Sequence, residues 1–198
     1  MNRILKAVLL TSAIIGISAV GACAFKKANK EYTSETYPLK YKAEVMEASE
    51  KYDISPALIY GVIKTESNFK PQSESNAGAV GLMQLTEDTF IWLQTYYKDE
   101  NELSFEDLKE PEINIDYGTH VLSILFDMYE DEKTVLCAYN AGMGTVDDWL
   151  ENKEYSEDGK TLTTVPYPET DNYHRLVMQN ESVYNKLYFS KDSSAKEL

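Results

Sequence analysis

Residues 55–67 read SPALIYGVIKTES, and this stretch carries the clearest signal for the fold. Ser55 and Pro56 are typical of a helix start, with serine as the N-cap and proline as the first helical residue. The apolar residues that follow recur at helical spacing, and Pro71 marks an end to the segment. We therefore predict an amphipathic helix from Pro56 to about Ser67.

Helical periodicity continues on both sides of this stretch. Further helices are predicted over 41–52, from Thr86 onward, over 111–130, 133–141 and 144–150, and through a long last helix over 173–187. A small hairpin over 153–165 is the one place where a strand pair fits. The sequence contains no internal repeat. We predict a compact all-α domain.

The composition is that of a globular protein with an acidic surface. The chain has 198 residues and a net charge of -14, and residues 1–30 contain five bases and no acid, so residues 31–198 carry -19. Such a body repels nucleic acid and anionic lipid head groups, so we expect no nucleic-acid partner. The fifteen tyrosines suit a carbohydrate groove, but they equally suit half-buried helix faces.

The first 25 residues predict export. Residues 7–25 carry no charge and are flanked by basic residues, as in a signal-anchor helix or a long signal peptide. Residues 20–23, which read VGAC, also resemble a bacterial lipobox that would lipidate Cys23. We favour an uncleaved anchor over lipidation, and either over full secretion. All three place the rest of the chain outside the cytoplasm, and the first two attach it to the cell membrane.

The exported part divides into three segments. Residues 26–40 are polar and contain Pro38, which predicts a tether. Residues 41–189 hold the predicted helices and form the globular domain, and residues 190–198 form a polar tail.

Several common chemistries lack their residues. The chain has two histidines, His120 and His174, and no HExxH, GxSxG, P-loop or dinucleotide motif. Cys137 lies in an apolar run and reads as a small buried hydrophobe, and no cysteine spacing suggests zinc. We therefore expect neither a metal ion nor a cofactor, and we expect the histidines to be surface or core residues.

Glu66 is the strongest candidate for chemistry. It follows Val62 and Ile63 by four and three residues, which places it on the apolar stripe of the predicted helix. Burial there would disfavour the carboxylate and raise its pKa, as a general acid requires near neutral pH. The alternative is a glutamate at the edge of the stripe that reaches water, and helical geometry alone does not separate the two.

Three further segments combine small and polar residues. Residues 76–84 read NAGAVGLMQ and form a glycine-punctuated loop whose backbone a ligand can approach closely. Residues 138–142 read AYNAG and end a helix with a polar pair before a glycine. Residues 166–173 read PYPETDNY and lead into the last helix.

These motifs, in this order, resemble the catalytic domain of the soluble lytic transglycosylase (SLT) family, a member of the lysozyme-like superfamily. The resemblance covers residues 40 to 189 and rests on Glu66-Ser67, Ser75, the loop ending at Gln84, and the two later segments. It implies a lysozyme-like helical fold and peptidoglycan as the substrate. Two positions depart from the common family pattern, because Glu87 replaces a proline and His174 replaces a valine, and they leave subsite preference open.

The resemblance also implies roles for individual residues. Glu66 would be the sole catalytic acid and base, and Ser75 and Tyr139 would hydrogen-bond around it. The sugar groove would be lined by Met83, Gln84, Asn140, Glu169 and Tyr173. Glu66 would protonate the bond between N-acetylmuramic acid and N-acetylglucosamine and then deprotonate the C6 hydroxyl, which closes a 1,6-anhydro ring without metal or water.

Three other functions stay open at this point. A goose-type lysozyme-like hydrolase would need a second carboxylate, for which Glu74, Asp88 and Glu169 are candidates. A non-catalytic glycan-binding module would keep the groove without turnover, but such a domain is free to lose Glu66. The third alternative is a structural membrane partner of a larger cell-wall assembly, with catalysis secondary.

Overall fold

The computed structural model describes residues 21, 33, 35–96 and 103–190. The chain divides into two compact units, Met1–Leu39 and Lys40–Leu198. In the first unit, the backbone N–H of Tyr37 donates to the carbonyl of Thr33 at 2.8 Å. The predicted membrane segment and polar tail lie almost entirely outside the described residues. Among the described residues, no helix is both long and apolar enough to cross a membrane.

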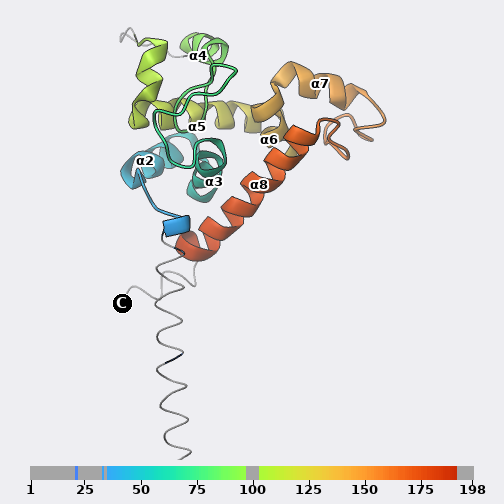
Figure 1. Cartoon of the computed structure of the whole chain (residues 1–198). Helices are drawn as coiled ribbons and strands as arrows, with labels where there is room; N and C mark the ends of the chain where they lie inside the picture. Colours follow the sequence, from blue (N-terminus) through green and yellow to red (C-terminus); the bar gives the residue numbers. More distant parts are fainter. Residues whose placement is uncertain (1–20, 22–32, 34, 97–102, 191–198) are drawn as a thin grey trace, which may run out of the picture. The chain divides into compact units, whose positions relative to one another are not determined.

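The second unit is helical, which confirms the predicted all-α class. Its elements (Figure 1) are α2 (Lys42–Tyr52), α3 (Pro56–Glu66), α4 (Glu87–Gln94), the 3-10 helix η1 (Phe105–Lys109), α5 (Pro111–Met128), α6 (Glu132–Ala141), α7 (Met143–Glu151), α8 (Pro168–Tyr184) and the π-helical turn η2 (Asn185–Phe189). Pro56, Pro111 and Pro168 each start a helix, because a first-turn residue needs no N–H.

Helix α3 is the centre of the unit, and every residue from Ala57 to Ile63 is buried. Helix α8 packs along it, and a Cβ at Gly61 would lie 3.0 Å from the carbonyl oxygen of Val177. A larger residue at Gly61 would therefore force the two helices apart. Ser55 lies at the N-cap as predicted, but its side chain makes no capping hydrogen bond.

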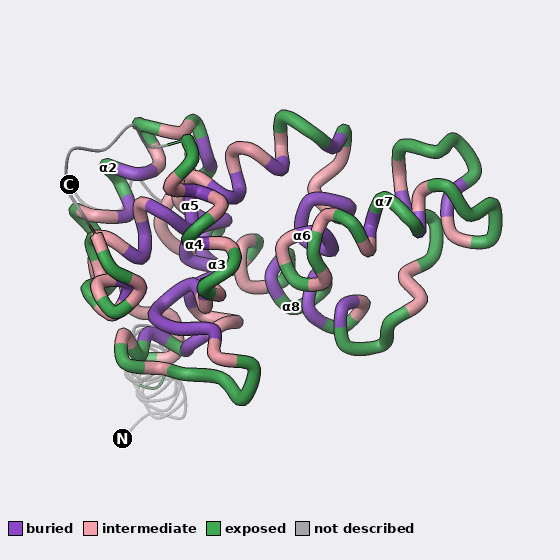
Figure 2. The backbone as a smooth tube through the Cα atoms, turned by 90° about the horizontal axis from the view of Figure 1, so that it is seen from above, coloured by how far each residue is buried: buried purple, intermediate pink, exposed green. Residues whose placement is uncertain are grey.

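The other helices enclose α3 and form a frame for its C-terminal end. Helix α5 packs against α2, α4 and α6, and α8 packs against both α3 and α6. Figure 2 shows that buried residues concentrate along α3, α5 and α6, whereas the segment that follows α7 is largely exposed.

Two sequence predictions need correction. No strand forms over 153–165, so the predicted hairpin is wrong. Asp158 instead accepts hydrogen bonds from the backbone N–H groups of Lys160 and Thr161, both at 2.8 Å, and this local turn replaces the strand ladder. The last helix also begins earlier than predicted, at Pro168, and the 3-10 helix over 105–109 was not predicted.

Candidate active site

Glu66 is the last residue of α3 and lines a cavity of about 300 Å³. The cavity is bounded by three groups of residues, from the loop before α4, from α4 and α5, and from the end of α6. Burial raises the pKa of the Glu66 carboxyl from 4.5 to about 7, and the nearby Tyr173 hydroxyl partly opposes this. The predicted half-buried glutamate with a raised pKa is thus present.

The loop over 73–85 forms one wall of the cavity and is held by its own backbone. Val80 and Leu85 exchange two N–H···O bonds of 2.9 and 3.0 Å, and Gly81 donates to Ser73 O at 2.9 Å. Gln84 has a left-handed backbone, with φ of 51°, and its side-chain amide donates to the carbonyls of Ser73 and Gly81. Both donors of this amide are therefore engaged, and its oxygen remains to accept from a ligand.

Two buried side chains outside the predicted site anchor this loop. Asn114 on α5 is fully buried, accepts from Met83 N at 2.7 Å and donates to the carbonyls of Val80 and Leu108. Ser67 donates to Leu82 O at 2.8 Å, which ties the loop to the end of α3 beside Glu66. The sequence analysis did not identify Asn114, whose one signal is an amide amid the apolar pattern of α5.

Two buried phenols lie beside Glu66. Tyr139 on α6 donates to the carbonyl of Met83 at 2.8 Å, and burial together with the Glu66 charge raises the pKa of its hydroxyl. Tyr173 on α8 is 7% exposed, and the pKa of its hydroxyl is raised by the same two causes. The Tyr173 hydroxyl makes no hydrogen bond of standard geometry within the described part of the chain, although it is close enough to stabilise the Glu66 carboxylate.

The hydroxyl of Ser75 is placed differently from the arrangement that the resemblance implies. It accepts from Ala79 N at 3.0 Å and so closes a turn of the loop at the edge of the cavity. Within the described residues, neither Ser75 nor Tyr139 hydrogen-bonds to Glu66. Met83 does not line the cavity, because its side chain is fully buried and packs against Gly118. Met83 reaches the site through its backbone alone.

Asn140 joins the cavity to a second hollow of about 390 Å³. Its side-chain oxygen Oδ1 accepts from Thr170 Oγ1 at 2.8 Å, which links the end of α6 to the first turn of α8. Glu169 is exposed and lines the second hollow. The sequence-predicted residues Asn140 and Glu169 therefore meet at one wall of this hollow.

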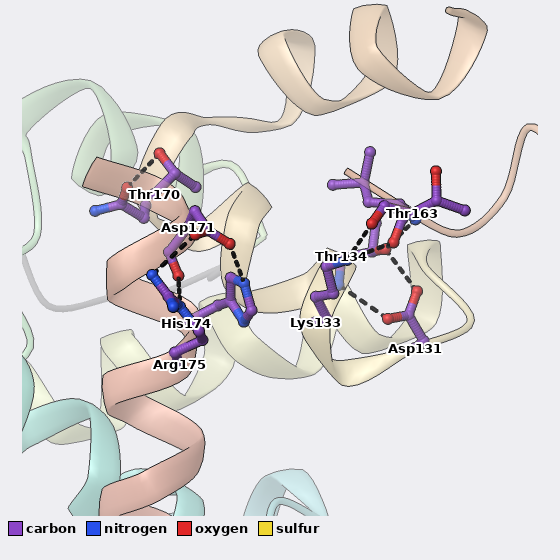
Figure 3. Close-up of polar contacts among 10 residues, drawn as sticks. Asp131, Lys133, Thr134, Thr163, Thr170, Asp171, His174 and Arg175 are labelled. Carbon is purple, nitrogen blue, oxygen red and sulfur yellow. Dashed lines mark hydrogen bonds and ion pairs between the residues drawn. The ribbon is translucent and has the colours of Figure 1, made fainter. Parts of the chain in front are cut away.

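Polar contacts fix the start of α8 and the segment before it (Figure 3). Asp171 is 3.1 Å from Nε2 of His174 and 2.9 Å from the Arg175 guanidinium. His174 is 6% exposed and is therefore a core residue. Lys133 on α6 donates to the carbonyls of Leu162 and Thr163 and holds the segment that precedes α8.

Acidic side chains are rare in the lining of the cavity. Counting only residues that the structure describes, Glu66 is the one acidic side chain in its lining. Glu74 lies outside it, with a 61% exposed side chain 3.9 Å from Lys109 Nζ, and Asp88 is exposed on the first turn of α4. In the described ranges, no three His, Cys, Asp or Glu residues are grouped to hold a metal ion.

A comparison with protein families decides the classification. The model of the transglycosylase SLT domain matches residues 44–162. The chain belongs to this family. The matched range contains α3, the loop over 73–85 and the end of α6, which carry most of the site.

Individual relatives extend the similarity over most of the chain. The soluble lytic murein transglycosylase of Salmonella typhimurium is 27% identical over 165 residues, which are 82% of this chain and 26% of that protein. Membrane-bound lytic murein transglycosylase C of Serratia proteamaculans is 32% identical over 167 residues, 72% of this chain and 45% of that protein. The chain thus spans between a quarter and a half of the length of these relatives.

Solved structures of this family share the fold. The 70 kDa soluble lytic transglycosylase of Escherichia coli superposes with a TM-score of 0.70 at 25% identity, over 81% of this chain and 26% of that one. A complex of the 70 kDa soluble lytic transglycosylase with bulgecin A gives a TM-score of 0.71 with the same identity and coverage. The predicted lysozyme-like helical fold is confirmed.

Proposed function

We propose that this chain is a peptidoglycan lytic transglycosylase in which Glu66 is the single catalytic acid and base. The observation that carries this proposal is a half-buried glutamate with a pKa of about 7 as the one acid in the lining of the cavity, among the described residues. A carboxyl group with that pKa is substantially protonated near neutral pH and releases its proton at little cost. Family membership and the names of the relatives support the same reaction.

The reaction that fits this site uses one carboxyl group twice. Glu66 protonates the glycosidic oxygen between N-acetylmuramic acid and N-acetylglucosamine, and the bond to C1 of the muramic acid breaks. The acetamido group of the substrate stabilises the positive charge that develops at C1. Glu66, now ionised, takes the proton from the C6 hydroxyl, whose oxygen attacks C1 and forms the 1,6-anhydro ring.

Neighbouring groups support both halves of this cycle. Burial favours the neutral acid that the first step needs, and the Tyr173 hydroxyl favours the carboxylate that the second step needs. Because the two effects oppose each other, the pKa stays close to neutral and either form is accessible. The residues Ser75, Gln84 and Asn140 line the cavity and provide polar contacts for sugar hydroxyl and acetamido groups.

A goose-type hydrolase is disfavoured by the position of its candidate second carboxylates. A hydrolase of that kind needs a second carboxylate to position water across the sugar ring from the acid. Glu74 and Asp88 lie outside the cavity lining, and Glu169 lines the second hollow. A non-catalytic glycan-binding module would have no need of a buried, protonated Glu66.

The chemical structure of the product ends provides the test. Peptidoglycan digested by the wild-type chain should release muropeptides with 1,6-anhydromuramic ends, which mass spectrometry finds lighter by one water than hydrolytic ends. In water enriched in heavy oxygen, these ends should carry no label. Labelled reducing ends as the main product would replace the transglycosylase assignment with the hydrolase.

The role of Glu66 is tested separately. Glu66→Gln keeps the shape of the side chain and removes the proton donor, so turnover should fall by about 10² to 10⁴ while the fold persists. Glu47→Gln removes an exposed carboxylate on α2 and should leave turnover unchanged. A Glu66→Gln variant that keeps a tenth of wild-type turnover would exclude the assigned role.

We further propose that the chain acts outside the cytoplasm, attached to the membrane by residues 7–25 or by a lipidated Cys23. The names of several relatives, membrane-bound lytic murein transglycosylase C, support this location. The full chain should fractionate with membranes. If Cys23→Ala lacks the mass of a lipid that the wild type carries, or no longer fractionates with membranes, the lipid is the anchor. If membrane retention is unchanged and the mass differs only by the substitution, the helix is the anchor. Recovery of most of the protein from the medium would contradict both.

A further inference from the structure

The cavity that contains Glu66 is only part of a longer depression. Asn140 lines both this cavity and the second hollow, so the two adjoin at the end of α6. Trp92 on α4 lines the first, and Tyr167, just before α8, lines the second. A chain of sugars that fills both hollows would therefore reach from α4 to the start of α8.

Each of these two aromatic rings is braced from the side by another ring. Trp92 meets Tyr96 edge to face, with centroids 5.2 Å apart and an interplanar angle of 72°. Tyr167 meets Trp149 in the same manner, at 5.0 Å and 80°. Trp149 is 6% exposed whereas Tyr167 is 55% exposed, so a buried ring holds an exposed one in place.

A braced, solvent-facing ring suits the flat face of a sugar. One face of a pyranose ring presents mainly C–H groups, and it can cover the face of an aromatic side chain while the hydroxyl groups bond at the edges. A ring already held by a neighbour loses little conformational freedom when a ligand covers it, which favours binding.

Glu66 belongs between these two rings. Glu66 and Asn140 line the same cavity, and Asn140 also lines the hollow of Tyr167, so the α6 side of this cavity leads from Glu66 toward Tyr167. Trp92 is carried by α4, which packs on α5. Figures 1 and 2 both show α4 apart from α7, with α6 between them.

We propose that Trp92 and Tyr167 are sugar-binding residues on opposite sides of the bond at Glu66, so that the chain binds the interior of a glycan strand and cleaves it endolytically. This proposal rests on the proposed function. It assigns a ligand, a β-1,4-linked N-acetylated glycan, to the second hollow. It adds Trp92, which lies outside the family motifs, and it gives a role to Tyr167, which lies within the segment over 166–173.

Binding is measured with the full-length Glu66→Gln chain, which holds the sugar without cleaving it. The probe is the β-1,4-linked hexamer of N-acetylglucosamine, titrated by calorimetry. Trp92→Ala and Tyr167→Ala should each weaken binding roughly tenfold, because each removes one stacked ring. The double variant should weaken it about a hundredfold, because distant sites add. Ile91→Ala and Leu176→Ala remove exposed apolar side chains that line neither hollow and should leave binding unchanged.

Trp92→Leu guards against a folding defect, because it keeps an apolar side chain and removes only the flat ring. Hexamer affinity that stays within twofold in Trp92→Leu or in Tyr167→Ala would overturn the proposal. The wild-type chain should cut long, uncross-linked strands into intermediate lengths first, and an initial release of disaccharides alone would also overturn it. Muropeptide products are measured separately. Anhydro ends together with an unchanged hexamer affinity would reject the sugar-binding roles of Trp92 and Tyr167 and leave the proposed function standing.

Discussion

Replacement of Glu66 by glutamine should stabilise the folded chain at high pH and leave it unchanged at low pH. The carboxyl has a pKa of about 7 when folded and about 4.5 when unfolded. A group with a raised folded pKa binds its proton more tightly in the folded state. Its contribution to stability is therefore complete below pH 4.5 and is lost as the pH rises to 7.

The magnitude follows from the same two values. The loss is about 1.4 kcal/mol for each pH unit between 4.5 and 7, or about 3 kcal/mol in total. Glutamine has nearly the same volume and carries no charge at any pH, so the variant escapes this loss. We expect Glu66→Gln to exceed the wild type by about 3 kcal/mol at about pH 8 and to match it within about 1 kcal/mol at about pH 4.

The assay is urea unfolding of both full-length chains, followed by far-ultraviolet circular dichroism across this pH range. Burial, and then a hydrogen bond with Glu132, raises the pKa of Glu181 to about 7. The plot of wild-type stability against pH therefore contains the titrations of both Glu66 and Glu181 in the same pH range. The difference between wild type and variant isolates Glu66. Glu47→Gln should change stability by less than about 0.5 kcal/mol at every pH. If Glu66→Gln raised the free energy of unfolding by the same amount at both ends of this pH range, the reasoning would be refuted.

Four other substitutions test the surroundings of Glu66. Tyr173→Phe removes the hydroxyl that favours the carboxylate, so the pKa of Glu66 should rise and the alkaline limb of the pH–rate profile should move to higher pH; a limb that stays in place would contradict the contact. Gly81→Ala places a Cβ 2.0 Å from Asn114 Nδ2 at a φ of 85° and should cost more than about 3 kcal/mol of unfolding free energy. Gly78→Ala, with an open Cβ position at a φ of 80°, should cost about 1 kcal/mol, and equal losses at the two glycines would discount the clash. Asn114→Ala removes the partner of the buried Met83 N–H and one donor each from the carbonyls of Val80 and Leu108, although the Val80 carbonyl keeps its bond from Leu85 N. The substitution should cost about 3 kcal/mol, so a loss under about 1 kcal/mol in urea unfolding would argue against the anchoring role of Asn114.

The helices that surround the site were largely predictable because their signals are local. Ser55-Pro56 marks the start of α3, and Gly142 marks the end of α6, and each signal acts through its own backbone conformation. The raised pKa of Glu66 was one of two outcomes that the helical spacing allowed, because a residue beside an apolar stripe can be buried with it or can reach water at its edge. The hairpin predicted over 153–165 was wrong although its replacement is also local, because Asp158 bonds backbone N–H groups two and three residues ahead and so forms a turn in place of a strand.

The sequence alone determined the helices and placed Glu66 beside the apolar stripe of α3, because helix periodicity and helix caps depend on residues a few positions apart. Only the tertiary structure decided how the loop over 73–85 is held and what surrounds Glu66. Asn114 reaches this loop from α5, and Tyr139 and Tyr173 approach Glu66 from α6 and α8. These contacts form between residues far apart in the chain, so no local pattern encodes them, and they exist only once α5, α6 and α8 have packed around α3.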